Sequence, residues 1–119
     1  MAKTYVIECK CGYANVLFEG EGLLARNLDY IRMAFSSEQL EGFEQAFASG
    51  VLAGYGLQGR ISSCIKCRKL YSNDVLHYII DGHERRLVRP CIECNGEMTP
   101  HELPPACPEC SQKTIIREG

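Results

Sequence analysis

Residues 91–110 read CIECNGEMTPHELPPACPEC and contain two Cys-x-x-Cys pairs. The chain has 119 residues and eight cysteines, and the other four also come in pairs, as Cys9-x-Cys11 and Cys64-x-x-Cys67. Paired thiols bind metal ions, form disulfides or carry out dithiol redox chemistry. The choice among these decides what stabilises the fold, because a domain this small often needs a cross-link in addition to its core.

The N-terminal stretch MAKTYVIECKCGY lacks the basic and apolar regions of a secretion signal. No window approaches the roughly 20 apolar residues that span a bilayer, so we expect no membrane segment. We therefore expect a cytoplasmic protein whose thiols are kept reduced, which favours metal binding over disulfides. Redox exchange is disfavoured because these pairs precede short strands or loops, whereas a thioredoxin-like pair opens a helix.

A structural zinc ion takes four ligands, and each Cys-x-x-Cys turn supplies two sulfurs at one point. Four such pairs make two four-cysteine sites with no thiol left over, which predicts two bound Zn²⁺ ions, with iron as the alternative metal. The predicted metal ligands are Cys9, Cys11, Cys64, Cys67, Cys91, Cys94, Cys107 and Cys110. The three histidines are expected outside the coordination spheres, His77 and His83 as strand and turn residues and His101 as a hydrogen-bond donor to a sulfur.

The order of the pairs suggests which of them share a metal. The simplest arrangement is sequential, with the first pair joined to the second and the third joined to the fourth. An interleaved and a nested arrangement remain as alternatives. The residue after each second cysteine should tolerate a left-handed turn, and Gly12 and Asn95 suit this position better than Arg68 and Ser111 do.

The stretches CIECNGE and CPEC resemble the metal-binding turns of the zinc-ribbon and rubredoxin-like superfamily, and CKCGY is similar to a rubredoxin turn with one residue fewer between its cysteines. The chain as a whole resembles small bacterial proteins with tandem zinc ribbons and no defined activity. The resemblance implies short β-hairpins around structural metal ions. It implies no single activity, since zinc ribbons serve as staples and as contact modules for proteins or nucleic acids.

Hydrophobic patterns outside the cysteines predict the remaining elements. Residues 3–19 read as two strands around a tight turn, and 53–59 as a flexible connector rich in glycine. Two helices are expected within about 23–50, with Leu24, Leu28, Ile31 and Phe35 on one stripe, a capping box at Ser36 and Gln39, and a stop at Gly50. Asp81-Gly82 predicts a two-residue hairpin turn that places Ile80 opposite His83.

Together these patterns predict an α+β fold of two zinc-ribbon (rubredoxin-like) modules built from short β-hairpins. The first module would cover residues 1–90 and carry the two-helix insertion. The second would cover residues 91–119.

Charge is distributed unevenly along the chain. Residues 60–90 hold seven Lys or Arg against three Asp or Glu, a net charge of +4, whereas the segments on either side each carry −3. This basic hairpin predicts a contact surface for a partner, either through paired charges or through cations and stacking rings. The predicted partner-binding residues are Tyr71, Tyr78, Arg85, Arg86 and Arg89.

The function predicted first is a zinc-binding protein-interaction or adaptor module without enzymatic activity, because the sequence has no phosphate-binding loop, nucleophile elbow or open metal site. A protein partner is expected first because the surface charge is mixed. Nucleic-acid binding through the basic hairpin 60–90 is the second prediction, and rubredoxin-like electron transfer through iron is the third. The sequence leaves the oligomeric state open.

Overall fold

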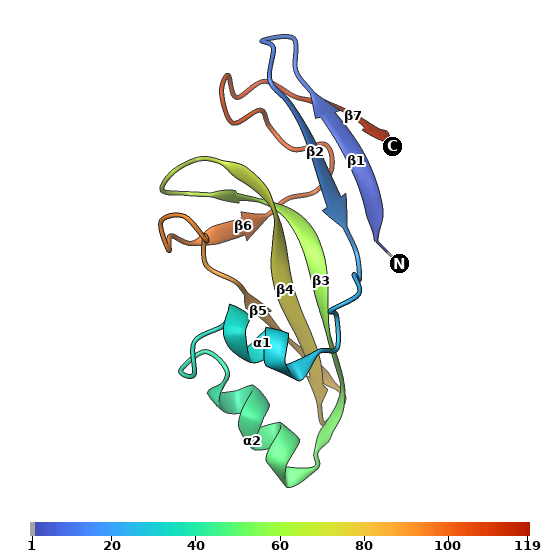
Figure 1. Ribbon diagram of the computed structural model, residues 1–119, viewed down its shortest axis with the longest axis vertical. Helices are drawn as coiled ribbons and strands as arrows, with labels where there is room; N and C mark the ends of the chain where they lie inside the picture. The colour runs from blue at the N-terminus through green and yellow to red at the C-terminus, as the bar shows by residue number, and fades with distance from the viewer. Residues whose placement is uncertain (1) are drawn as a thin grey trace.

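The structure, a computed structural model, describes residues 2–119 and shows an elongated α+β fold of mostly strands with two helices, about 51 Å along its longest axis. Two antiparallel sheets lie along this axis (Figure 1). The three-stranded sheet has the order β2-β1-β7, with β1 at Lys3–Glu8, β2 at Ala14–Glu19 and β7 at Ile115–Glu118. The four-stranded sheet has the order β5-β4-β3-β6, with β3 at Leu52–Cys64, β4 at Leu70–Ile80, β5 at His83–Val88 and β6 at Met98–Pro100.

Both sheets follow one plan. A hairpin comes first, and a later strand then pairs with the first strand of that hairpin: β7 pairs with β1, and β6 pairs with β3. We call β1, β2, β7 and the loop before β7 the outer unit, and β3 to β6 the inner unit. Because the inner unit lies between β2 and β7 in the sequence, one hairpin-plus-strand unit is inserted into another.

The hairpin between β4 and β5 forms as predicted. Ile80 pairs with His83, Tyr78 with Arg85 and Leu76 with Leu87. The φ angles of Asp81 and Gly82 are 51° and 76°, and two successive positive angles are what a type I′ turn requires.

The helices α1 (Leu28–Ala34) and α2 (Glu41–Ser49) lie against one face of the four-stranded sheet (Figure 1). The Phe43 ring of α2 is fully buried, with its centroid 5.5 Å from that of Tyr55 and 5.4 Å from that of Tyr78. Both contacts are edge-to-face, an arrangement that aromatic pairs prefer. The helices therefore complete the core of the inner unit.

The helix boundaries differ in part from the prediction. Asn27 caps α1 through its side chain, so the helix begins at Leu28 and leaves out Leu24. The carbonyl of Ala25 instead accepts a hydrogen bond of 2.7 Å from the backbone N–H of Leu57 in β3. Ser36 and Gln39 do form the reciprocal bonds of the capping box, although they precede α2 by one turn. Gly50 ends α2 with φ of 75°, as predicted.

The prediction of a flexible connector at 53–59 is wrong, because these residues belong to β3. Two of their three glycines, Gly56 and Gly59, lie against neighbouring segments. A Cβ at Gly59 would overlap the ring of Phe18, and a Cβ at Gly56 would meet the Glu21 side chain. At Gly59 the Phe18 ring thus occupies the space that a side chain would fill in an ordinary strand.

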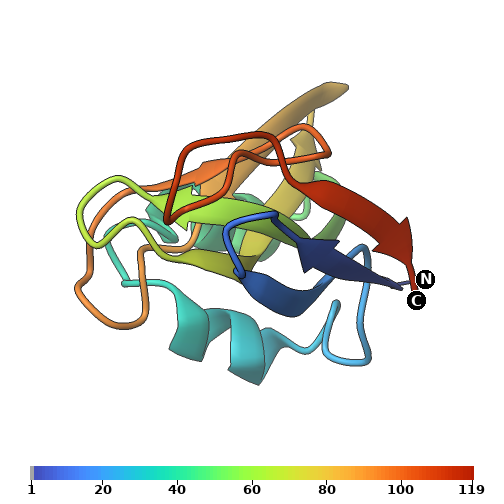
Figure 2. The same ribbon diagram turned by 90° about the horizontal axis from the view of Figure 1, so that it is seen from above.

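The two units share a second cluster of buried side chains. Ile7 of the outer unit packs with Ile61 and Leu70 of the inner unit. Hydrogen bonds from backbone N–H groups to side chains join the units as well, from Ile61 to the Glu19 carboxylate and from Phe18 to the Ser72 hydroxyl. Figure 2 shows β1 and β7 side by side next to the longer strands of the inner unit.

The predicted module boundary at residue 90 remains a prediction. The last strand of each sheet comes from beyond this boundary, since β6 joins β3 and β7 joins β1.

Candidate metal centres

Four similar turns, which we call knuckles, hold the cysteines. In each Cys-x-x-Cys knuckle the N–H of the first cysteine donates to the carbonyl five residues further on, as from Cys64 to Lys69 at 3.0 Å. The N–H of the residue after the second cysteine donates back to the first, as from Arg68 to Cys64 at 2.9 Å. The same two bonds occur in the knuckles that begin at Cys91 and Cys107.

The Cys9-x-Cys11 knuckle keeps this pattern with one residue fewer. The N–H of Cys9 donates to Tyr13 at 2.9 Å, and that of Gly12 donates back to Cys9 at 3.0 Å. The residue after the second cysteine has a positive φ in all four knuckles, at Gly12, Arg68, Asn95 and Ser111. The shorter spacing therefore preserves the geometry that presents two sulfurs together.

The eight cysteines meet in two groups of four, in which all sulfurs lie within 4.8 Å of one another. The inner site contains Cys64, Cys67, Cys91 and Cys94, and the outer site contains Cys9, Cys11, Cys107 and Cys110. The pairing is nested, so the sequential pairing predicted first is wrong. It fails because β6 pairs with β3 and so brings the Cys91 knuckle to the Cys64 knuckle. In the same way, β7 pairs with β1 and brings the Cys107 knuckle to the Cys9 knuckle.

The sulfur positions suit a tetrahedral metal site. With zinc–sulfur bonds of about 2.3 Å, the sulfurs of a tetrahedron lie about 3.8 Å apart. The measured Sγ–Sγ distances are 3.4 Å for Cys9–Cys110, 3.5 Å for Cys11–Cys107, 3.4 Å for Cys64–Cys94 and 3.8 Å for Cys67–Cys91. A disulfide needs about 2.05 Å, and all eight thiols are free. Two four-cysteine sites that can bind metal ions are therefore present.

Backbone N–H groups prepare one thiol of each site for deprotonation. The N–H of Cys67 lowers the pKa of Cys64 to about 6, assisted by that of Lys66 and against the effect of burial. Burial raises the pKa of Cys107, but the N–H groups of Glu109 and Cys110 outweigh it and bring the pKa to about 7. Since metals bind the thiolate, each site starts with a ligand that is ionised near neutral pH.

No histidine contributes to either group among residues 2–119. The Nδ1 atom of His77 lies 2.6 Å from the Glu84 carboxylate, and His83 is exposed at the hairpin turn. His101 was expected to donate to a sulfur, but its Nε2 atom hydrogen bonds to the hydroxyl of Ser63 instead. This expectation is wrong because β6 pairs with β3 and brings His101 beside Ser63, the residue before the candidate metal ligand Cys64.

The predicted partner-binding residues do not share one surface. Tyr78 is 7% exposed in the aromatic core, and Arg89 donates to the Asp74 carboxylate at 3.1 Å, so both serve the fold. Tyr71 packs against the inner site, where burial raises the pKa of its hydroxyl. Only Arg85 and Arg86 are exposed, on the edge strand β5.

Two residues that the sequence analysis passed over are exposed beside the inner site. Ile65 and Ile92 occupy the position after the first cysteine in its two knuckles, and they are 62% and 67% exposed. The repeated Cys-Ile-x-Cys pattern was the signal that could have identified them. The outer knuckles have Lys10 and Pro108 at this position instead.

Comparisons of the chain with protein-family models, with curated proteins and with solved structures found no match. In the part of the chain that the structure describes, neither helix has the length and apolar character needed to cross a membrane.

Proposed function

We propose that the protein binds two Zn²⁺ ions as structural staples and acts as an adaptor that contacts a protein partner. The observation that supports zinc is the donor set, four thiols per site and nothing else, at separations that suit a tetrahedral ion. Each unit resembles a zinc ribbon, in that a hairpin knuckle and a later knuckle supply two ligands each. A bound zinc supplies folding free energy, and a site closed by four protein ligands leaves no position for a substrate.

The metal content tests the first part of this proposal. Protein purified without added metal should contain two zinc ions per chain and be colourless. An iron-loaded protein with visible absorption would instead support rubredoxin-like electron transfer. Protein that is folded without any metal would contradict a structural role.

The adaptor role rests on Ile65 and Ile92. Both are β-branched, more than half exposed, and held by knuckles whose backbone bonds fix their position. An N–H bond of 3.1 Å from Ile65 to Glu97 joins the two knuckles directly. Rigid apolar side chains lose little conformational entropy on binding, which makes them effective anchors at a protein interface.

The adaptor proposal is tested by affinity purification from the source cells with the double variant Ile65→Ser, Ile92→Ser. We expect one or more partners identified with the native protein to be lost with this variant, while its zinc content is unchanged. Ile115→Ser is the matched control, since Ile115 is 61% exposed on the outer unit. Equal capture by the native protein and the double variant would count against this surface.

The proposal includes a cytoplasmic location and the absence of enzymatic activity. The location rests on the sequence arguments above, and the absence of activity rests on those arguments and on the closed form of the two sites.

A further inference from the structure

A groove of about 550 Å³ lies between the inner and outer metal sites, apart from the isoleucines of the adaptor surface. One wall comes from the β1–β2 hairpin, and the other comes from the knuckle and first residues of β4 in the inner unit. Pro108 and Glu109 of the outer site close one end. The groove includes Tyr13, Leu17, Arg68, Lys69, Tyr71 and Glu109.

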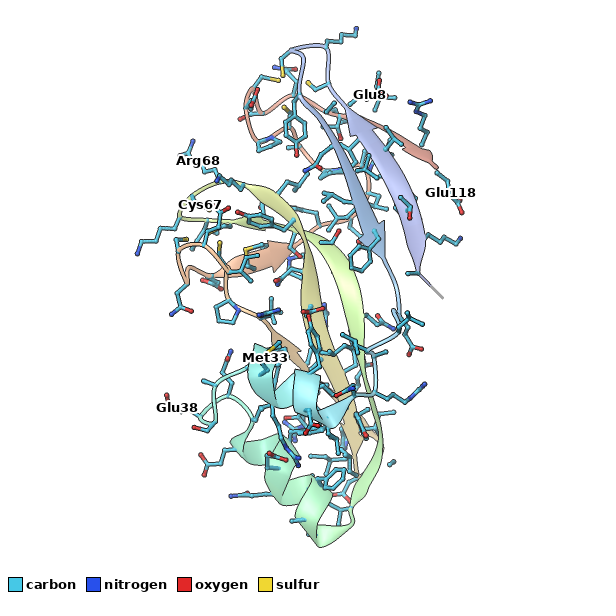
Figure 3. The ribbon with its side chains drawn as sticks, in the orientation of Figure 1. Glu8, Met33, Glu38, Cys67, Arg68 and Glu118 are labelled. Atoms are coloured by element: carbon cyan, nitrogen blue, oxygen red, sulfur yellow. The ribbon has the colours of Figure 1, made fainter. Side chains whose placement is uncertain are left out.

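The groove combines cations with aromatic rings. Arg68 lies on its rim, and Lys66 is two residues away in the same knuckle; both are exposed and neither has an ion-pair partner within residues 2–119. Lys69 is paired with Glu93 at 2.7 Å. Figure 3 shows Arg68 on the side of the β3–β4 turn that faces the outer unit.

Arg68 occupies a backbone position that arginine does not favour. Its φ of 62° is left-handed, and the equivalent residues of the other knuckles include Gly12 and Asn95, which tolerate this conformation well. Closure of the knuckle requires this conformation, and Ser111 adopts it in the same way. The knuckle thereby holds the exposed Arg68 at the edge of the groove.

The aromatic walls come from Tyr13 and Tyr71, which are both half-buried. The Tyr13 hydroxyl accepts a hydrogen bond of 3.2 Å from the Asn15 amide, which orients its ring. Rings next to free cations form the combination that single-stranded nucleic acids recognise, because bases stack on the rings and phosphates pair with the cations.

We propose that this groove binds single-stranded nucleic acid, with one phosphate on Arg68 at the rim, a base stacked on Tyr13, and a second phosphate on Lys66 where the strand runs past the groove along the same knuckle. The proposal goes beyond the adaptor function. Within the basic segment 60–90 it uses the knuckle that holds Lys66 and Arg68, and not Arg85 and Arg86 on β5. Glu109 on the rim opposes a polyanion, so its charge weakens the binding.

The test is fluorescence anisotropy of the zinc-loaded protein with short labelled oligo-dT and oligo-U. With two phosphate contacts, log K should fall against log salt with a slope of about −1.4. Arg68→Asn keeps a residue suited to the left-handed turn and should weaken binding about tenfold and reduce the slope by about 0.7. Tyr13→Leu should weaken binding by about five- to a hundredfold, and Glu109→Gln should strengthen it severalfold.

Arg117→Gln is the matched control, because it also removes one positive charge but lies on β7 opposite Val6, on the other face of the outer sheet from Leu17. It should leave the affinity within about twofold. Comparing oligo-dT with oligo-U distinguishes DNA from RNA as the preferred strand.

Four outcomes would overturn the proposal. The first is no binding of either oligonucleotide at about 50 mM salt. The second is loss of binding on Arg85→Ser, Arg86→Ser but not on Arg68→Asn, which would move the surface to the hairpin. The third is equal binding of a poly-glutamate peptide, which would show that Arg68 serves an acidic partner. The fourth is loss of zinc from the Arg68→Asn variant, which would show that Arg68 balances the charge of the inner site.

Discussion

At the scale of single residues, the left-handed position after each second cysteine decides whether a knuckle closes. The four residues there are Gly12, Arg68, Asn95 and Ser111, with φ between 58° and 100°. The sequence analysis identified Gly12 and Asn95 from their known tolerance of this conformation. It ranked Arg68 and Ser111 below them, yet both adopt the conformation, because the backbone bonds of the knuckle override the preference of the side chain.

Gly12→Ala should reduce the free energy of unfolding by about 1 kcal/mol, because a Cβ is unfavourable at positive φ. No atom lies within 4 Å of the added Cβ, so the effect is conformational and not a steric clash. Gly22→Ala is the control, since Gly22 also has open space around it but lacks a positive φ. Denaturant unfolding of the zinc-loaded proteins measures both, and equal losses in the two variants would contradict the argument.

Tyr30 offers a pH test of the inner core. Its hydroxyl donates to the Asp74 carboxylate at 2.7 Å, and desolvation together with this neighbour raises the pKa of Tyr30 above its usual 10.0. A raised pKa contributes stability that is complete below pH 10 and is lost as the pH rises through the folded pKa. Tyr30→Phe should therefore lower the unfolding free energy by about 1 kcal/mol at neutral pH.

The difference between the native protein and Tyr30→Phe should shrink as the pH rises above 10. Thermal unfolding at a series of pH values measures it. A difference that stays constant across this range would show that the hydroxyl does not couple to Asp74.

At the scale of elements, local patterns predicted what local forces determine. The Asp81-Gly82 turn fixed the β4–β5 register, and Gly50 ended α2, because both depend on φ at one or two residues. The segment 53–59 was predicted wrongly because its glycines pack against Phe18 and Glu21, which are distant in sequence. Such contacts leave no periodic signal in the strand itself.

The packing of α2 on the inner sheet depends on Phe43. This ring is fully buried between Tyr55 and Tyr78, so Phe43→Ala should lower the unfolding free energy by about 3–5 kcal/mol. Phe47→Ala removes the same atoms from a side chain that is 41% exposed, and it should cost about 1 kcal/mol. Denaturant titration followed by circular dichroism compares them. Similar losses from the two variants would mean that the helices do not dock as described.

At the scale of the whole molecule, the pairing of knuckles is the feature that the sequence could not determine. The number of cysteines and their spacing predicted two groups of four thiols, and the structure forms them. Proximity in sequence favoured the sequential pairing, but this preference is weak because each doubling of a loop adds only about 0.6 kcal/mol of closure free energy. Strand pairing of β6 with β3 and of β7 with β1 decides the nested arrangement instead.

The nested arrangement makes the two sites separable in principle. The inner site belongs to the sheet that the helices cover, whereas the outer site joins the first and last strands of the chain. Removal of Cys9 and Cys11 should therefore expose Cys107 and Cys110, whereas the sequential pairing would expose Cys64 and Cys67 instead.

The most direct test is cysteine alkylation of the zinc-loaded double variant Cys9→Ser, Cys11→Ser, read by mass spectrometry together with the metal content. The nested sites predict one zinc per chain, rapid alkylation of Cys107 and Cys110, and protection of the four inner cysteines. Alkylation of Cys64 and Cys67, with Cys107 and Cys110 still protected, would contradict the nested metal sites.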